Sequence, residues 1–180
     1  MGLAQLRDTG LAMGRGFGVN QQEIDHLQQL WIQEHATGRA LNIGCGQKRV
    51  VGAINLDMNP ARWAWVNVTA DAHVLPFPDG VFDSVVSSHV IEHLHSPVAA
   101  LREMARVLHP GGTMAHVIPD HRYTPHQHSK RHTFAHHYHE WCGPDEFKSV
   151  MRQVAGMLRV IALEEFPGFR WSFRLEAVRL

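Results

Sequence analysis

The stretch ALNIGCGQKRVVGAINLD, residues Ala40 to Asp57, decides the fold of this chain. It contains a short apolar strand, a turn with Gly44 and Gly46, and a second apolar strand that ends in Asp57. Because glycine has no side chain, a ligand can lie directly against the backbone of such a turn, although two glycines at this spacing also occur in ordinary tight turns. An acid at the end of the second strand can accept hydrogen bonds from a ribose diol. The stretch is therefore typical of a nucleoside-containing cofactor held at the carboxyl edge of a parallel sheet.

Three further segments follow in order along the chain. They are VLPFPDGVFD at Val74–Asp83, SVVSSHVIEHL at Ser84–Leu94 and LREMARVLHPGGTMAHVIP at Leu101–Pro119. Together with LNIGCG and INLD, this series resembles the class I S-adenosylmethionine (SAM) dependent methyltransferases, and most closely the small methyltransferase type 11 group. The resemblance covers about residues 41–119 and implies a doubly wound, Rossmann-like α/β sheet of seven strands. The implied strand order is 3-2-1-4-5-7-6, with the last strand antiparallel.

The first crossover of that sheet is expected to be unusually short. Only eight residues separate Ile43 from Gly52, whereas a parallel crossover normally needs about a dozen or more and usually includes a helix. The first crossover helix must therefore be very short or missing. A helix is predicted at residues 21–35, because apolar residues from Ile24 to Trp31 recur at helical spacing. We expect this helix to cover the sheet face that the missing crossover helix leaves bare.

Length and composition favour one compact domain, since the chain has 180 residues and an apolar fraction of 44%. We assign residues 1–38 to an N-terminal segment that carries the covering helix, and residues 39–180 to the methyltransferase domain. Beyond the first strand at 40–43, strands are expected at residues 53–56, around 65–68, and at 82–88, 113–118, 160–166 and 173–178, and further helices from Ser96–Pro97 and from Pro144.

The charge balance and the cysteines argue against several classes of partner and compartment. The chain has 17 Lys and Arg against 17 Asp and Glu, so no strong field favours nucleic acid or an acidic membrane. No apolar run approaches the roughly 18 residues of a membrane span, and the first ten residues lack the apolar core of a signal peptide. The two cysteines, Cys45 and Cys142, are interpreted as free thiols in a reducing compartment. We expect a cytoplasmic protein that binds neither nucleic acid nor a membrane, and its oligomeric state is left open.

The resemblance assigns contacts with SAM to particular residues. The backbone of Gly44, Cys45 and Gly46 would pass beneath the sulfur and the methionine tail. Asp57 would bind the ribose hydroxyls, and Met58 would pack on the adenine face. The alternatives are a strand-end cap for Asp57 and a core filler for Met58.

Two more segments complete the cofactor site that the resemblance implies. Asp71 would accept a hydrogen bond from the exocyclic amine of adenine, and the backbone amide of Ala72 would donate to the ring; a solvated loop acid is the alternative for Asp71. Ser87, Ser88 and His89 lie at the end of the fourth strand and would face the reaction centre. Backbone carbonyls there would contact the amine and sulfonium end of SAM.

The sequence departs from the family at two positions of the glycine turn. Many members carry an acid at the position of Asn42, where it orders the turn and attracts the amino group of SAM through water. Asn42 can still hydrogen-bond and is assigned to the cofactor site, but it brings no charge. A third glycine is also absent, and Lys48 lies near its expected place.

The segment His89–His93, HVIEH, also matches H-x-x-E-H, an inverted zinc-protease motif. On a helix His89 and His93 would share one face and could bind zinc, while Glu92 would activate water. The motif directly follows a predicted buried strand, however, and Pro97 begins a new helix just beyond it. Since the methyltransferase resemblance explains the segment without a metal, we predict no metal ligand here.

A histidine-rich segment follows the predicted fifth strand, with seven histidines between His121 and His139. In the fold that the resemblance implies, residues after this strand line the acceptor side, so we interpret the segment as a substrate lid. The candidate substrate-binding residues are Tyr123, His132, His136, His139 and Trp141. A metal site and an unspecific polar loop are the alternatives.

We therefore predict SAM-dependent methyl transfer to a small-molecule acceptor by direct in-line displacement, with S-adenosylhomocysteine as product. An acceptor oxygen or nitrogen that must lose a proton needs a base, and His89 and His121 are the candidates, followed by His93 and Tyr123. The alternatives are a non-catalytic SAM or nucleoside-binding protein and a histidine-liganded metal protein. A nicotinamide dehydrogenase would need the fuller G-x-G-x-x-G turn and a long first crossover helix, which this sequence lacks.

Overall fold

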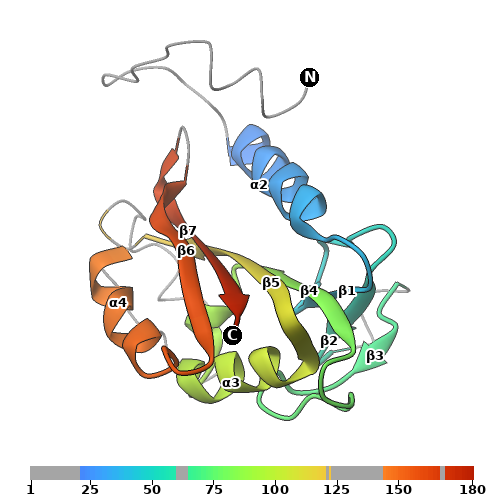
Figure 1. The fold of residues 1–180 in the computed structure, drawn as a ribbon. Helices are drawn as coiled ribbons and strands as arrows, with labels where there is room; N and C mark the ends of the chain where they lie inside the picture. Colours follow the sequence, from blue (N-terminus) through green and yellow to red (C-terminus); the bar gives the residue numbers. More distant parts are fainter. Residues whose placement is uncertain (1–20, 60–64, 121, 123–143, 167–168) are drawn as a thin grey trace.

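The computed structural model describes residues 21–59, 65–120, 122, 144–166 and 169–180. These residues form one seven-stranded sheet of order β3-β2-β1-β4-β5-β7-β6 (Figure 1). The strands are β1 (Ala40–Ile43), β2 (Ile54–Asp57), β3 (Val68–Thr69), β4 (Phe82–Ser88), β5 (Leu108–Pro119), β6 (Leu158–Phe166) and β7 (Phe169–Arg179). Strands β1 to β5 pair in parallel, whereas β7 runs antiparallel to both β5 and β6. The predicted fold class and strand order are confirmed.

The link between β1 and β2 contains turns and no helix. Leu41 still pairs in parallel with Ile54, so the chain returns to the same end of the sheet within this short segment. The prediction that the first crossover helix is very short or missing is therefore confirmed, since no helix forms there.

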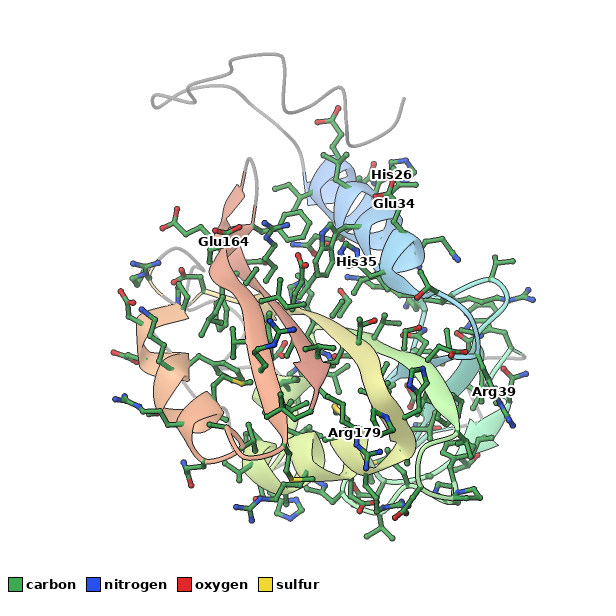
Figure 2. All side chains as sticks on the ribbon, in the orientation of Figure 1. His26, Glu34, His35, Arg39, Glu164 and Arg179 are labelled. Atoms are coloured by element: carbon green, nitrogen blue, oxygen red, sulfur yellow. The ribbon has the colours of Figure 1, made fainter. Side chains whose placement is uncertain are left out.

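Helix α2 (Gln21–His35) covers the sheet face that this short crossover leaves bare (Figure 1). Its apolar side places Trp31 and Ile32 in a cluster with Val86 of β4 and Val117 of β5. Figure 2 shows polar side chains of the same helix, with His26 and Glu34 exposed to solvent and His35 lying closer to the sheet. The predicted covering helix therefore forms with the predicted bounds.

The opposite face of the sheet is covered by α3 (Pro97–Val107) and α4 (Pro144–Arg152). Helix α3 begins as predicted, because the Ser96 hydroxyl accepts a hydrogen bond from the backbone of Ala99 at 3.4 Å and Pro97 occupies the first position. Successive residues of a strand point to opposite faces, so Val85 packs in the core under α3 and α4 while its neighbour Val86 packs under α2. Within the described ranges, no helix is long and apolar enough to cross a membrane.

Several element boundaries differ from the sequence-based predictions. Strand β5 begins at Leu108 rather than at residue 113, because the His-Pro-Gly-Gly segment continues from α3 straight into the sheet. Phe82 pairs with Leu108, but Ser84 pairs with Thr113, so the extra residues form an irregularity in the strand. Strand β7 is likewise longer than predicted, and the third strand is reduced to two residues.

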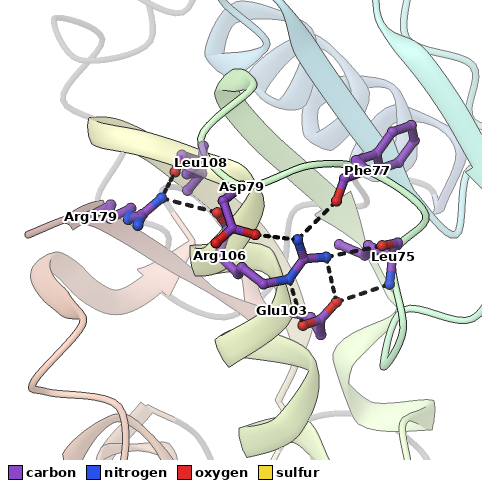
Figure 3. A network of polar contacts seen from close by, with 7 residues as sticks. All are labelled: Leu75, Phe77, Asp79, Glu103, Arg106, Leu108 and Arg179. Atoms are coloured by element: carbon purple, nitrogen blue, oxygen red, sulfur yellow. Dashed lines mark hydrogen bonds and ion pairs between the residues drawn. The ribbon is translucent and has the colours of Figure 1, made fainter.

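Arg106 of α3 fixes the loop that lies beyond the predicted adenine-edge residues (Figure 3). Its guanidinium donates to the carbonyl oxygens of Leu75 at 3.0 Å and Phe77 at 2.8 Å. The same group forms ion pairs with Glu103 at 2.8 Å and Asp79 at 2.7 Å. One side chain therefore ties the loop of residues 75–79 to α3.

Replacing Arg106 by alanine should lower the free energy of unfolding by about 1–3 kcal/mol, because two charge-assisted contacts and two carbonyl partners are lost together. Urea denaturation of Arg106→Ala would measure this loss. Arg102→Ala is the matched control, since Arg102 lies on the same helix and is exposed, with one hydrogen bond to the carbonyl of Gln153. Equal losses in the two variants would contradict a special role for Arg106.

Candidate cofactor and acceptor site

The glycine turn, residues 44–46, lies at the carboxyl end of β1. Gly44 has φ +60°, and a Cβ placed there would lie 2.5 Å from Cγ2 of Val90. Both the backbone conformation and the contact with Val90 therefore require glycine. Val90 follows β4, so this contact also seats the end of β4 against the turn.

Gly46 is held through both its backbone N–H and its carbonyl. Its N–H donates to Oδ2 of Asp57 at 2.8 Å, and its carbonyl accepts from the indole N–H of Trp65 at 2.9 Å. A Cβ on Gly46 would have its nearest neighbours at 4.0 Å. The space above Gly46 is therefore open, which fits a turn against which a ligand can lie.

The Asp57 carboxylate joins the glycine turn to the end of β2. Oδ2 accepts from Gly46, while Oδ1 accepts from the backbone of Asn59 at 2.9 Å. The strand-end cap weighed as an alternative is thus present. Because each carboxylate oxygen has two lone pairs, this cap leaves capacity to accept from a ribose hydroxyl as well. Met58 beside it is 68% exposed, so it is not a core filler.

Asn42, in β1, and Cys45, in the glycine turn, help to order this turn. Both side chains are buried. The Asn42 amide donates to the carbonyl of Lys48 and to the side chain of Asn55, each at 2.9 Å. Burial and the neighbouring Asp57 carboxylate raise the pKa of Cys45 to about 11, so its thiol stays protonated at neutral pH. The Asn42 contacts order the turn, and the backbone of Cys45 adds to this order, because its N–H donates to the carbonyl of Leu56 at 3.0 Å and its carbonyl accepts from the N–H of Lys48 at 2.6 Å.

The predicted adenine-edge residues lie at the end of β3. Oδ1 of Asp71 accepts from the backbone of His73 at 2.9 Å and lies 2.5 Å from Nδ1 of the same residue. Burial opposes the ionisation of Asp71, but these contacts with His73 outweigh it and lower the Asp71 pKa. The Ser96 N–H donates to Nε2 of His73 at 3.3 Å, which links this edge to the start of α3. Asp71 is therefore a charged and oriented acid, and Ala72 beside it is buried.

The carboxyl end of β4 turns two serines in opposite directions. Lys48 stands near the position of the third glycine that this turn lacks, and its Nζ donates to the Ser88 hydroxyl at 3.2 Å. This contact brings the Lys48 side chain to the carboxyl end of β4. Ser87 is fully buried instead, and its hydroxyl lies 2.7 Å from Nδ1 of His116. The Ser87 hydroxyl therefore points away from the Ser88 hydroxyl, because alternate residues of a strand point to opposite faces, and the expected backbone contact of Ser87 with SAM stays a prediction.

His89 follows β4 and has φ +57°, the only positive value for a non-glycine residue in the described part of the chain. Its ring lies near Glu92, with 3.8 Å between Nδ1 and Oε1, and Glu92 is also 3.7 Å from Nε2 of His93. Desolvation, together with the charges of Lys48 and His93, lowers the pKa of His89 to about 3. Burial raises the pKa of Glu92 to about 8. At neutral pH, His89 and Glu92 are therefore both mainly uncharged.

The zinc alternative for the HVIEH segment fails on geometry. The helix there, η2 (Ile91–His93), is a single 3-10 turn, and His89 lies before it in a left-handed conformation. Among the residues that the structure describes, no three His, Cys, Asp or Glu side chains are arranged to hold a metal ion.

The structure adds three residues to this edge that the sequence did not single out for the site. Gln28 of α2 is 1% exposed and bonds to His89, Trp65 bonds to the glycine turn, and Lys48 reaches Ser88. The only signal for Gln28 in the sequence is a polar residue on the apolar face of a predicted helix. The remaining predicted site residues lie outside the described residues: His121, Tyr123, His132, His136, His139 and Trp141.

Comparisons with known proteins agree with this geometry. Residues 41–116 match the profile of the family described as "Methyltransferase domain". Ajmaline N-methyltransferase from Rauvolfia serpentina is 46% identical over 52 residues, which make up 29% of this chain and 18% of that protein. The SAM-dependent methyltransferase from Aquifex aeolicus has a TM-score of 0.62 at 14% identity, covering 89% of this chain and 94% of that chain. A Thermotoga maritima structure, titled a SAM-dependent methyltransferase and possible histamine N-methyltransferase, has a TM-score of 0.62 at 20% identity, covering 86% and 88%.

These likenesses differ in what they establish. The chain spans less than a third of the length of the curated relatives it matches, and the structural neighbours establish the fold. The profile match covers the glycine turn, the acid at the end of β2 and the end of β4, which are the elements that the structure brings together. The profile match over residues 41–116 and the strand order both support a class I SAM-dependent methyltransferase, and the structural neighbours show that the chain has the fold of this family.

Proposed function

We propose that this protein transfers the methyl group of SAM to a small-molecule acceptor by in-line displacement. The observation that carries the proposal is the glycine turn, residues 44–46, which is open at Gly46 and whose Gly46 N–H donates to the Asp57 carboxylate at 2.8 Å. Such a turn leaves room for a ligand on the backbone and places a carboxylate beside it. The match to the methyltransferase family profile supports SAM as that ligand.

In this proposal each part of the edge holds one part of the cofactor. The backbone of residues 44–46 carries the methionine end, Asp57 binds the ribose, and the exposed Met58 packs on adenine. Asp71 and the amide of Ala72 contact the adenine edge. SAM supplies an already activated methyl group, so the residues of this chain mainly align the acceptor and exclude water.

His89 has a restricted chemical role in this scheme. With its pKa near 3 it is neutral, and it can accept a hydrogen bond from an acceptor O–H or N–H. The same low pKa makes it a weak proton acceptor, because the efficiency of a base depends on a pKa near the working pH. His89 therefore orients an acceptor, and removal of a strongly held proton falls to another group, for which His121 stays a candidate.

The main rival is a protein that binds SAM or a nucleoside without transferring a methyl group. Incubation with SAM and a panel of small oxygen, nitrogen and sulfur nucleophiles, with detection of S-adenosylhomocysteine by mass spectrometry, separates the two. Product formation supports transfer. SAM binding without product from any acceptor favours the rival. We also infer a cytoplasmic protein, and the balanced charge supports an acceptor other than nucleic acid.

Gly46→Ala should weaken SAM binding by about tenfold or more, because the new methyl group would occupy the open space above the turn. Gly52→Ala is the matched control, since Gly52 lies in the same β1–β2 link with φ +84°, and a Cβ at that position would have nothing within 4 Å. Both substitutions should cost about 1–2 kcal/mol of stability from the left-handed backbone. Calorimetric titration with SAM, and with NAD as the rival ligand, measures the difference.

Unchanged SAM affinity in a folded Gly46→Ala variant would remove the turn from the site. Binding of NAD at micromolar concentration without binding of SAM would contradict the proposed cofactor.

A further inference from the structure

Gln28 is a buried polar residue on the apolar face of α2. It shares that face with Ile24, Trp31 and Ile32, all of which are buried, and is itself 1% exposed. A buried amide without partners costs free energy, so an apolar residue would be the ordinary choice here. The hydrogen-bond partners of Gln28 must therefore explain why a polar side chain occupies this buried position.

Both ends of the Gln28 amide are satisfied, and by distant parts of the chain. Nε2 donates to the hydroxyl of Ser172 in β7 at 3.0 Å. Oε1 lies 2.9 Å from Nε2 of His89 at the end of β4. With Nε2 bonded to Ser172, the end of the amide that faces His89 is the oxygen Oε1. An amide oxygen only accepts, so the His89 ring must donate, and its proton lies on Nε2.

We propose that Gln28 is a positioning residue of the methyltransferase site, holding the His89 imidazole in the tautomer that carries its proton on Nε2. This inference rests on the proposed function for its consequence, but the hydrogen bond itself does not. With the proton on Nε2, the unprotonated nitrogen is Nδ1, on the side where Glu92 lies 3.8 Å away. Nδ1 is then the atom of His89 that can accept a hydrogen bond.

The backbone conformation of His89 is imposed by its surroundings. The residue has φ +57°, a conformation that L-residues seldom adopt and that neighbouring structure must maintain. Its N–H donates to the carbonyl of Val117 at 2.9 Å, which fixes the backbone but not the ring. The contact with Gln28 then fixes the ring, as an outer hydrogen bond orients a functional histidine.

The inference extends the site beyond the family profile. The profile covers residues 41–116, whereas Gln28 and Ser172 lie outside it on either side. Helix α2 therefore contributes to the site as well as covering the sheet.

The test is a nitrogen-15 spectrum of histidine-labelled, cofactor-free protein, with His89→Asn used to assign the His89 signal. Wild type should show a slowly exchanging proton on Nε2 of His89. Gln28→Leu should lose that proton signal, while Gln28→Glu should keep it because a carboxylate still accepts. Gln33→Leu should also keep it, since Gln33 lies on the same helix but bonds to the backbone of Val51.

Two spectral results would overturn the inference. One is a wild-type signal with the proton on Nδ1, which needs no variant to fold. The other is a folded Gln28→Leu variant whose Nε2 proton stays protected at an unchanged shift.

Addition of SAM to wild type should move the His89 signal, with calorimetry on the same sample reporting whether SAM binds. Binding without any change at His89 would place His89 outside the site and overturn the positioning role. Absence of SAM binding would overturn the proposed function, and with it the role of Gln28 in that function, while the tautomer result would stand.

Discussion

Between pH 6.5 and pH 3, His116 is expected to remove on the order of 4 kcal/mol from the free energy of unfolding. His116 lies fully buried in β5, where burial lowers its pKa from 6.5 to about 3. In this window the unfolded chain binds a proton at His116 and the folded chain does not, so falling pH favours the unfolded state. The loss is complete below the folded pKa. It is comparable with the total stability of a small domain, about 5–15 kcal/mol.

The buried partners of His116 show how to test this contribution. Nδ1 meets the hydroxyl of Ser87 at 2.7 Å, and Nε2 has no hydrogen-bond partner in the described part of the structure. The double variant Ser87→Ala/His116→Leu removes both polar groups together. Relative to wild type, its free energy of unfolding in urea should rise by about 3 kcal/mol between pH 6.5 and pH 4. His26→Asn, at an exposed position of α2, is the control; parallel pH profiles for the double variant and wild type would disprove the assignment.

Glu92 is expected to act in the opposite direction, removing on the order of 4 kcal/mol from the free energy of unfolding as the pH rises from 4.5 to 8. Burial raises the pKa of this carboxyl from 4.5 to about 8, and its Oε2 lacks a hydrogen-bond partner in the described ranges. The folded chain therefore keeps a proton that the unfolded chain releases. The stability that this proton contributes is fully present below pH 4.5 and is lost as the pH passes through 8.

Glu92→Gln should abolish this dependence, because the amide has the same shape and does not titrate. The variant should gain stability over wild type by about 4 kcal/mol between pH 4.5 and pH 8.5. Glu34→Gln, at an exposed position of α2, should leave the profile unchanged. A constant difference between Glu92→Gln and wild type across this range would show that Glu92 is already ionised in the folded protein.

In the wild-type protein, the pH-dependent contributions of His116 and Glu92 to the free energy of unfolding oppose each other. Between about pH 4.5 and 6.5, rising pH reduces the loss of unfolding free energy that His116 causes. Over the same range it increases the loss that Glu92 causes, at the same rate. Their sum is therefore nearly constant there, and only the separate variants reveal either one. Below and above this range, one contribution acts without the other to offset it.

Much of the fold was predictable because its signals are local. Residues 40–43 and 82–88 are short apolar runs bounded by turn residues, and the structure has strands at these positions. The helix at 21–35 follows from the spacing of its apolar residues. The short first crossover follows from chain length alone. The strand order came from the family resemblance rather than from any local pattern.

Only the part of the candidate site that is built from residues close together in the sequence was predictable. Gly44, Gly46 and Asp57 are close in the sequence, and the structure joins them as predicted through the Gly46–Asp57 hydrogen bond. At the end of β4 the hydroxyls of Ser87 and Ser88 point to opposite faces of the sheet. A strand position does not by itself say which of two faces meets the ligand.

The sequence by itself determined the glycine turn, the acid that follows it and the alternation of strands and helices, since these depend on residues only a few positions apart. The tertiary structure alone decided that Gln28 meets His89 and Ser172, across 61 and 144 residues. It also decided that Glu92 and His116 are buried, and therefore mainly uncharged at neutral pH. Burial and long-range hydrogen bonds exist only once distant segments pack together, and it is the loss of water around a side chain that sets its charge.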